Sequence, residues 1–229
     1  MRKLASVVAV IGLCFVVSAN ANLIISEVVD GTVDSGLPKF VELTNTGDTA
    51  IDLAGYSLGN INNGAPESTY APTDLSGMLA AGDSYVCSYE GGDEPGLGVF
   101  LDTYGFEPDN YDFGSFFNGD DVLVLYAGNP GAPHDGTGAI DVYGEVGVDG
   151  NGTFWEYMDG YSYRLPDYIV GQNPMVQNEW FYGGLDSLEG DDPVEMHLMY
   201  TTPGTHDFVP EPGSLALLLL GAFGVMRRR

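Results

Sequence analysis

Oxygen-rich turns are the residues of this sequence best suited to chemistry. Three short segments, 120–121, 149–152 and 189–193, combine Asp, Asn or Glu with Gly or Pro. Carboxylate and amide oxygens on flexible backbone are the ligands that Ca²⁺ prefers. Solvated turns are the competing interpretation, because Asp and Asn are also ordinary turn residues. No segment fits the EF-hand spacing, since Phe154 stands where that loop needs glycine. The candidate calcium ligands are Asp120, Asp121, Asp149, Asn151, Asp191 and Asp192.

No arrangement of residues indicates catalysis. The histidines, His134, His197 and His206, are isolated and none has metal-ligand spacing. The sequence has neither a Gly-x-Ser-x-Gly nucleophile motif nor a Gly-rich phosphate loop leading into a helix. Carboxylates are so numerous that any two could be taken for an acid–base pair, so their presence is uninformative. We expect a non-catalytic protein with no cofactor, calcium excepted.

Aromatic residues are abundant, with 14 Tyr, 11 Phe and 2 Trp. A group between residues 113 and 157 could form a surface that stacks on sugars or docks a protein. Core filling is the alternative for most of them, because large aromatics dominate the interior of β-sandwiches. The residues of this group are Phe113, Phe116, Phe117, Trp155 and Tyr157.

The charge of the chain is strongly negative and unevenly distributed. The formal net charge is −26, but most basic residues lie at the two ends. The stretch 22–208 keeps two basic residues, Lys39 and Arg164, against 32 acidic ones, which gives −30. Such a surface repels phosphate backbones, so we expect no nucleic-acid partner. It attracts divalent cations and cationic partners.

Short strands joined by turns account for most of the chain between its ends. Apolar residues recur at every second position, as in Val41 and Leu43, which is typical of strands with one buried face. The 33 Gly and 13 Pro fit frequent turns. No helical periodicity occurs outside the ends, which predicts an all-β, antiparallel β-sandwich. The predicted strands are 23–29, 40–45, 51–58, 84–89, 122–126 and 140–146, with weaker candidates at 161–165, 179–182 and 196–199.

The first 21 residues have the pattern of a cleaved secretory signal. Arg2 and Lys3 precede an apolar run, and Ala19 and Ala21 form a small-x-small cleavage site. Removal of this segment leaves Cys87 as the sole cysteine, so no intramolecular disulfide can form. Because Cys87 lies in a predicted strand, we expect a buried small hydrophobe rather than a reactive thiol.

The other end, 209–229, combines a Pro-rich break, a short apolar helix and a basic terminus. As a helix, residues 214–226 would span about 20 Å, short of the roughly 30 Å hydrocarbon core. The basic end fits a cytoplasmic location. This pattern resembles the PEP-CTERM sorting signal of Gram-negative bacteria that make extracellular polysaccharide. The residues that carry the resemblance are Pro210, Glu211, Pro212, Arg227, Arg228 and Arg229. It implies export, tethering to the inner membrane by a single short transmembrane helix, processing by an exosortase, and delivery to the cell envelope or extracellular matrix.

The body, 22–208, resembles the secreted bacterial form of the lamin tail domain. The resemblance rests on the order of its strands and on a closing pattern around Tyr163, Trp180 and Thr202. It implies an immunoglobulin-like sandwich and places acidic residues, here Glu27 and Glu42, in the first two strands. If these strands adjoin, the two carboxylates could share a proton or a cation, and solvated strand faces are the alternative.

We therefore expect a secreted module, associated with the envelope or matrix, that mediates adhesion or structural association with polysaccharide or surface proteins. One alternative is a calcium-dependent scaffold. Another is an accessory to, or part of, a secreted nuclease or phosphoesterase, because secreted lamin tail domains often accompany such enzymes. The sandwich nearly fills the body and leaves no room for a separate catalytic domain. The long loops at 60–76 and 90–112 depart from the family pattern and are where a specific function is expected.

Overall fold

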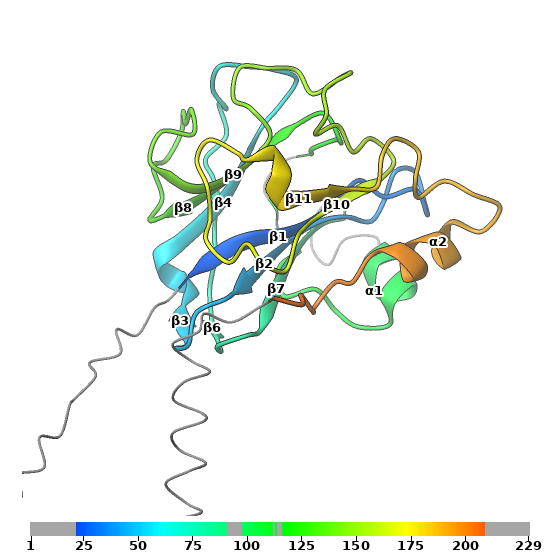
Figure 1. Ribbon diagram of the computed structural model, residues 1–229, viewed down its shortest axis with the longest axis horizontal. Coiled ribbons are helices and arrows are strands. Elements are labelled where there is room, and N and C mark those ends of the chain that lie inside the picture. Colours follow the sequence, from blue (N-terminus) through cyan, green and yellow to red (C-terminus); the bar gives the residue numbers. More distant parts are fainter. Residues whose placement is uncertain (1–21, 91–97, 112, 114–115, 209–229) are drawn as a thin grey trace, which may run out of the picture.

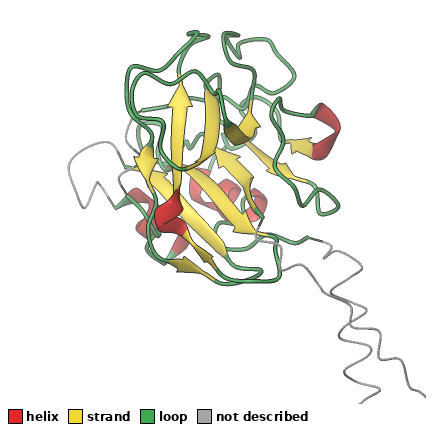
Figure 2. Cartoon of the chain, turned by 90° about the vertical axis from the view of Figure 1, so that its left-hand side faces the viewer, coloured by secondary structure: helices red, strands yellow, loops and turns green. Residues whose placement is uncertain are grey.

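The computed structural model describes residues 22–90, 98–111, 113 and 116–208, and its strands pair in antiparallel sheets. The predicted secretory signal and sorting signal lie outside these residues. The larger sheet has the order β11-β10-β1-β2-β7 and the smaller one β5-β4-β8-β9, with β3-β6 as a separate pair. Strands fill the middle of the molecule and loops extend beyond their ends (Figures 1 and 2). The expected antiparallel β-fold is confirmed.

The elements have the following bounds. The larger sheet comprises β1 (Leu23–Val29), β2 (Lys39–Asn45), β7 (Ser84–Tyr89), β10 (Tyr161–Arg164) and β11 (Trp180–Tyr182). The smaller sheet comprises β4 (Tyr56–Ile61), β5 (Thr73–Asp74), β8 (Val122–Ala127) and β9 (Ala139–Tyr143). The remaining elements are β3 (Ile51–Asp52), β6 (Met78–Leu79), the 3₁₀ turns η1 (Leu53–Gly55) and η2 (Gln177–Glu179), and the helices α1 (Val99–Tyr104) and α2 (Pro193–Tyr200).

The turn after β2 is organised by the side chain of Asn45. Its Nδ2 donates to the carbonyl oxygens of Thr49 (2.8 Å) and Leu79 (3.1 Å), and its Oδ1 accepts from the amide of Gly47 (3.1 Å). The chain then resumes as β3. The strand expected over 51–58 is interrupted, because the Asp52 carboxylate accepts the Ala54 amide and caps η1.

The main core lies between the two sheets. Val41 and Leu43 of β2 and Leu123 and Leu125 of β8 belong to this cluster and are fully buried. Four of the five aromatics considered for a contact surface fill the same core, and only Phe116 is exposed. The expectation of a contact surface at this group is therefore wrong, and the alternative of core filling accounts for the buried residues Phe113, Phe117, Trp155 and Tyr157.

The outer face of the larger sheet is also buried where α1 covers it. Phe40 of β2 packs edge-to-face on Phe100 (5.6 Å between centroids) and Tyr104 (5.8 Å) of α1, and α1 and α2 contact each other (Figure 1). The sequence predicted no helices here, so this expectation is wrong. Helix α1 has only six residues, too few to show a period.

The strand candidate at 196–199 lies inside α2 and is also wrong. Asp192 caps this helix by accepting the Glu195 amide (3.1 Å), and Pro193 occupies its first turn. The capping residues were visible in the sequence, but the apolar residues Leu198 and Met199 are exposed, so the amphipathic pattern that marks a surface helix is missing.

A buried ion network joins the two sheets at one edge. Arg164 of β10 donates from Nη2 to both carboxylate oxygens of Asp141 of β9 (2.7 Å each) and from Nη1 to Glu179 (2.9 Å). Its Nε donates to the Ile25 carbonyl (3.0 Å), and the Ile25 amide donates to Asp141 (2.8 Å). Arg164 also stacks over Trp180, and Arg164 and Asp141 are both fully buried. The network thus ties β1, β9 and β10 together.

We expect Asp141→Ala to lower the free energy of unfolding by about 3–5 kcal/mol, because it leaves the buried Arg164 charge without its bidentate partner. Chemical denaturation measures this change. Asp167→Ala is the matched control, since that carboxylate is exposed, and it should change stability by about 0.5 kcal/mol or less. A loss at Asp141 no larger than that of the control would show that the network contributes little.

Candidate functional site: a clamped segment between two grooves

Two buried carboxylates lie side by side on the outer face of the larger sheet. Glu27 of β1 and Glu42 of β2 are direct partners in the antiparallel register and are almost inaccessible to solvent. Burial raises the pKa of Glu42 to about 7. Burial, and then the neighbouring Glu42 charge, hold the pKa of Glu27 well above its usual range. The alternative of solvated strand faces is wrong because both side chains are buried, and burial favours the protonated form of each.

These carboxylates hold the segment that follows α2. The Thr202 amide donates to both oxygens of Glu27 (3.2 and 3.1 Å), and the Gly204 amide donates to Glu42 (2.7 Å). The other oxygen of Glu42 accepts from the Ser26 hydroxyl (2.7 Å). Just before this segment, the hydroxyl groups of Thr201 and Tyr104 are hydrogen-bonded at 2.8 Å. The segment 202–208 is thus clamped across the sheet although several of its residues are exposed.

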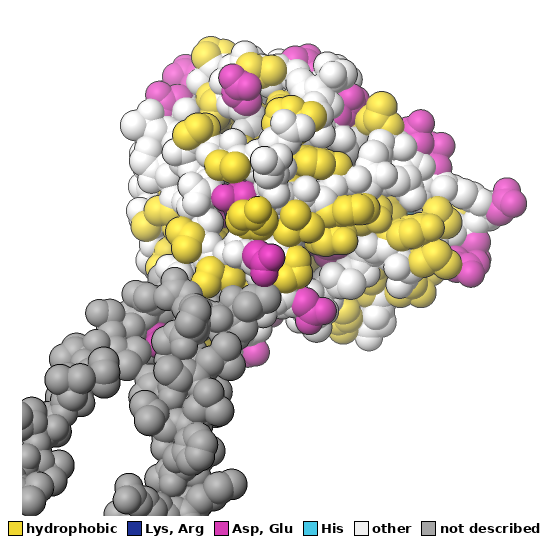
Figure 3. All heavy atoms as spheres, in the orientation of Figure 1, with side chains coloured by type: hydrophobic (Ala, Val, Ile, Leu, Met, Phe, Trp, Pro, Cys, Tyr) yellow, Lys and Arg dark blue, Asp and Glu magenta, His cyan; other side chains and the backbone are white. Residues whose placement is uncertain are grey.

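An aromatic groove of about 440 Å³ lies on one side of the clamped segment. Tyr163 of β10 stacks on Phe181 of β11 (4.8 Å, 18°) and on Tyr161 (6.3 Å, 17°), which in turn stacks on Tyr200 of α2 (5.9 Å, 19°). Phe181 and Tyr200 are about 40% exposed. Apolar side chains form a band over these elements in Figure 3. The exposed side chain of Met199 of α2 also lines the groove.

A second groove, of about 650 Å³, lies on the other side of the segment and is lined by acidic and hydroxyl groups. It contains the exposed carboxylates of Asp83, Asp109 and Asp207, together with Ser84 and Tyr85. We call the two cavities the aromatic groove and the acidic groove. The sequence suggested that a specific function would lie in the long loops 60–76 and 90–112. The acidic groove contains one residue of each, Ser76 and Asp109, and the aromatic groove contains none.

Neither of the two basic residues of the body is available at the surface. Arg164 is held in its ion network, and Lys39, which is 3% exposed, forms a buried salt bridge with Asp30. The sequence showed only that the body has few basic residues, and it assigned no role to either of them. Only their scarcity in an acidic body hinted at a structural role. Acidic partners are plentiful there, and a basic side chain can be buried when such a partner pairs with it.

The candidate calcium ligands do not converge on one site. Asn151 links two of them, since its Nδ2 donates to Asp120 (3.0 Å) and Asp149 (2.7 Å). Asp121 instead accepts the amides of Asn63 and Asn118 (2.7 Å each). Asp191 lies beside the cap of α2, which is formed by Asp192. Calcium binding at these turns stays a prediction.

The sequence did not single out the one described group with metal-ligand spacing. The carboxylates of Asp159, Asp186 and Glu189 lie within 4.8 Å of one another, mostly at the surface. Asp159 precedes β10, whereas Asp186 and Glu189 follow β11, 27 and 30 positions later, so no local motif joins the three. Exposed acidic groups often approach each other without an ion, and no second feature of the described residues points to one here.

The histidines lie in separate surroundings. The ring of His134 is hydrogen-bonded to the Tyr126 hydroxyl (3.1 Å), His197 is bonded to the Pro193 carbonyl within α2, and His206 lies in the clamped segment. Among the described residues, none of them joins a group of possible metal ligands. Cys87 is buried, as expected, and burial raises its pKa far above that of a reactive thiol.

Comparison with known proteins agrees with this architecture. Residues 16–146, more than half of the chain, match the Lamin Tail Domain family. The chain belongs to the lamin tail domain family. Its immunoglobulin-like fold continues past the matched region, because β10 and β11 complete the larger sheet. Residues 208–229 match the PEP-CTERM protein-sorting motif, so this lamin tail protein is exported and sorted to the cell surface, and the motif implies processing by an exosortase.

No curated protein matches the chain. Among solved structures, a DUF4876 family protein from Bacteroides thetaiotaomicron is similar, with 14% identity and a TM-score of 0.39 over 72% of this chain and 69% of that chain. Within the described residues, no helix of the lamin tail protein has the length and apolar character needed to cross a membrane.

We expect the lamin tail domain to lose stability as the pH rises from 5 to 8. The pKa of Glu42 is about 7 in the folded state against 4.5 for the free side chain, so in this range the folded state binds more protons than the unfolded state. The contribution of protonated Glu42 to the free energy of unfolding is complete below about pH 4.5 and is lost by about pH 7. Its upper limit is about 3 kcal/mol. Denaturant unfolding at several pH values measures it.

Glu42→Gln should flatten this pH dependence, because the side chain no longer titrates. Glu90→Gln is the matched control: Glu90 is equally buried and accepts the amides of Val99 and Phe100, but it holds the first turn of α1 rather than the clamped segment. The control should keep the slope of the unmodified protein. Identical slopes in all three proteins would rule out the acidic pair as the source.

Proposed function

We propose that this protein is a non-catalytic surface module that associates with envelope polysaccharide through the aromatic groove. The observation that carries the proposal is the row of stacked rings from Tyr200 to Phe181, which lines a groove. Aromatic side chains offer apolar contact area at little entropic cost, and contiguous exposed patches of this kind are typical of binding sites.

The groove has the general composition of a ligand site. Apolar and aromatic side chains line it together with polar ones, among them Thr202, His206 and Asp207. Sugar rings have one apolar face and several hydroxyl groups, so they complement such a surface. The groove lies at the strand edge of the larger sheet, on the rigid elements β10 and β11, which would hold the rings in place for repeated contact with a polymer.

The described residues give no positive support to an enzymatic alternative. A nuclease or phosphoesterase would need a metal centre or a nucleophile with a neighbouring base. His134 is instead bonded to Tyr126, and the group of Asp159, Asp186 and Glu189 contains no histidine. An acidic surface of net charge −30 between residues 22 and 208 would also repel phosphate esters. Adhesion is the function that these features support best.

We expect Phe181→Ala to weaken binding of the full-length protein to polysaccharide extracted from the producing cells by tenfold or more. The substitution removes the outermost ring of the row without touching the core. Phe154→Ala is the matched control, because Phe154 is also about half exposed but contacts Tyr182 away from the groove. Co-sedimentation with the polysaccharide measures binding. Equal loss in both variants, or in neither, would contradict the assignment of this groove.

We expect deletion of residues 209–229 to release the protein into the medium, because the sorting motif within them supplies the attachment to the cell surface. Immunoblotting of the cell and medium fractions measures this. Replacing Arg227, Arg228 and Arg229 with alanine keeps the length of the chain and separates the role of the basic end from that of the apolar segment. Unchanged retention after the full deletion would show that another part of the chain attaches the protein.

A further inference from the structure

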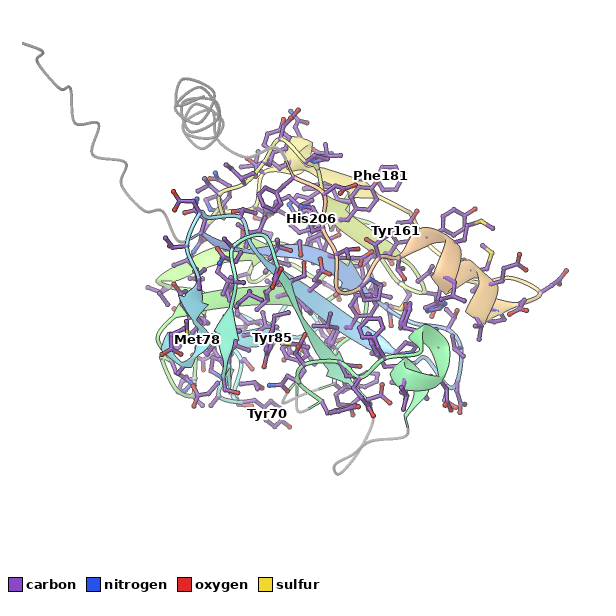
Figure 4. All side chains as sticks on the ribbon, turned by 90° about the horizontal axis from the view of Figure 1, so that it is seen from below. Tyr70, Met78, Tyr85, Tyr161, Phe181 and His206 are labelled. Carbon is purple, nitrogen blue, oxygen red and sulfur yellow. The ribbon has the colours of Figure 1, made fainter. Side chains whose placement is uncertain are left out.

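The aromatic and acidic grooves share a wall. His206 and Asp207 of the clamped segment line both cavities. Figure 4 shows His206 between Tyr161 and Phe181 on one side and Tyr85 and Met78 on the other. A polymer that crosses the clamped segment would therefore contact the aromatic rings of one groove and the carboxylates of the other. The two grooves are parts of one extended surface.

The acidic groove is suited to positive charge. Asp83, Asp109 and Asp207 contribute exposed carboxylates to it. No basic side chain lines it, and the one basic residue beside the aromatic groove, Arg164, is fully buried in its ion network. Burial lowers the pKa of His206 to about 4, so this ring is neutral and adds no positive charge to either groove. Every exposed charged side chain that lines the two grooves is therefore a carboxylate.

The negative charge of the acidic groove favours some classes of sugar over others. Carboxylate, sulfate or phosphate groups on a glycan would find no cation on the body, since Lys39 and Arg164 are both buried and paired. They would also be repelled by the long-range field of the acidic surface. An ammonium group on a sugar ring would instead find carboxylates within the same site that contacts the ring.

We propose that the two grooves together bind a polymer of amino sugars, with its rings against Tyr163 and Phe181 and its ammonium groups at Asp83 and Asp207. This inference rests on the proposed association with polysaccharide and specifies the chemical class of the ligand. It requires both halves of the surface, the stacked rings for affinity and the carboxylates for selection.

The test uses three oligosaccharide probes of equal length: a glucosamine hexamer, its fully N-acetylated counterpart and a galacturonic acid hexamer. Isothermal titration calorimetry on the full-length protein in detergent micelles should show the glucosamine hexamer binding at least tenfold more tightly than the acetylated one at low salt. The acidic hexamer should not bind. Added salt should reduce the preference, because it screens the charges.

Two variants separate the halves of the surface. The double variant Asp83→Asn, Asp207→Asn should remove most of the preference, so that the glucosamine and acetylated hexamers bind with similar affinity. Asp102→Asn, Glu145→Gln is the charge-matched control, because both carboxylates are exposed and line neither groove, and it should keep the preference. Phe181→Ala should weaken both hexamers. The comparison of the three probes on the unmodified protein is decisive even if a variant fails to fold.

The possible failures are distinct. Equal binding of the glucosamine and acetylated hexamers, both lost in Phe181→Ala, would overturn the charge selection and leave the aromatic groove as a glycan site. Tighter binding of the galacturonic acid hexamer would overturn the inference outright. Failure of all three probes would overturn it as well, and retained binding of extracted polysaccharide would then show that the proposed function survives without it.

Discussion

The pairing of Arg164 with Asp141 is the interaction on which the rest of the structure depends. It connects the two sheets at the edge where they would otherwise separate, and it uses both backbone groups of Ile25, which are not bonded to β10. A desolvated guanidinium is tolerated only because its donors are satisfied by carboxylates, a carbonyl and the face of Trp180. The one cysteine among the described residues, Cys87, is free. This network therefore joins distant segments of the chain, as a disulfide does in many secreted domains.

Acidic side chains perform a related task elsewhere in the domain. Glu27 and Glu42 hold the segment after α2, Glu90 holds the start of α1, and Asp121 holds the loop at Asn118. In each case a carboxylate accepts backbone amides that have no partner in a sheet. The negative charge of the sequence is therefore partly internal. It fixes loops in place, while the remaining carboxylates stay at the surface and give the protein its negative field.

The sequence was sufficient to predict the parts of the fold that depend on local pattern. The alternation at Val41 and Leu43 predicted β2, and Asn45 predicted the turn that follows. The burial of Glu42 could not be predicted in the same way, because it depends on α1, α2 and the clamped segment, which lie 50 residues or more away in the chain. Helices that cover a sheet with exposed outer residues carry little periodic signal of their own.

The candidate site shows the same division. Tyr161, Tyr163 and Phe181 were within predicted strands, but which face each side chain occupies depends on the register of β10 and β11. The aromatics that looked most suitable for binding, around Phe117, fill the core instead. Composition therefore predicted that aromatics would be prominent, and only the register of the strands showed which of them form a groove.

The burial of both basic residues has a consequence for survival at the cell surface. Trypsin-like proteases cut after Lys or Arg in a segment that can extend into their active-site cleft. Lys39 and Arg164 lie inside paired strands, and no other such residue occurs between 22 and 208. The folded domain thus offers these enzymes no cleavage point, and digestion requires unfolding of the sheet. Intact copies would persist among such proteases, and unfolded copies would be removed.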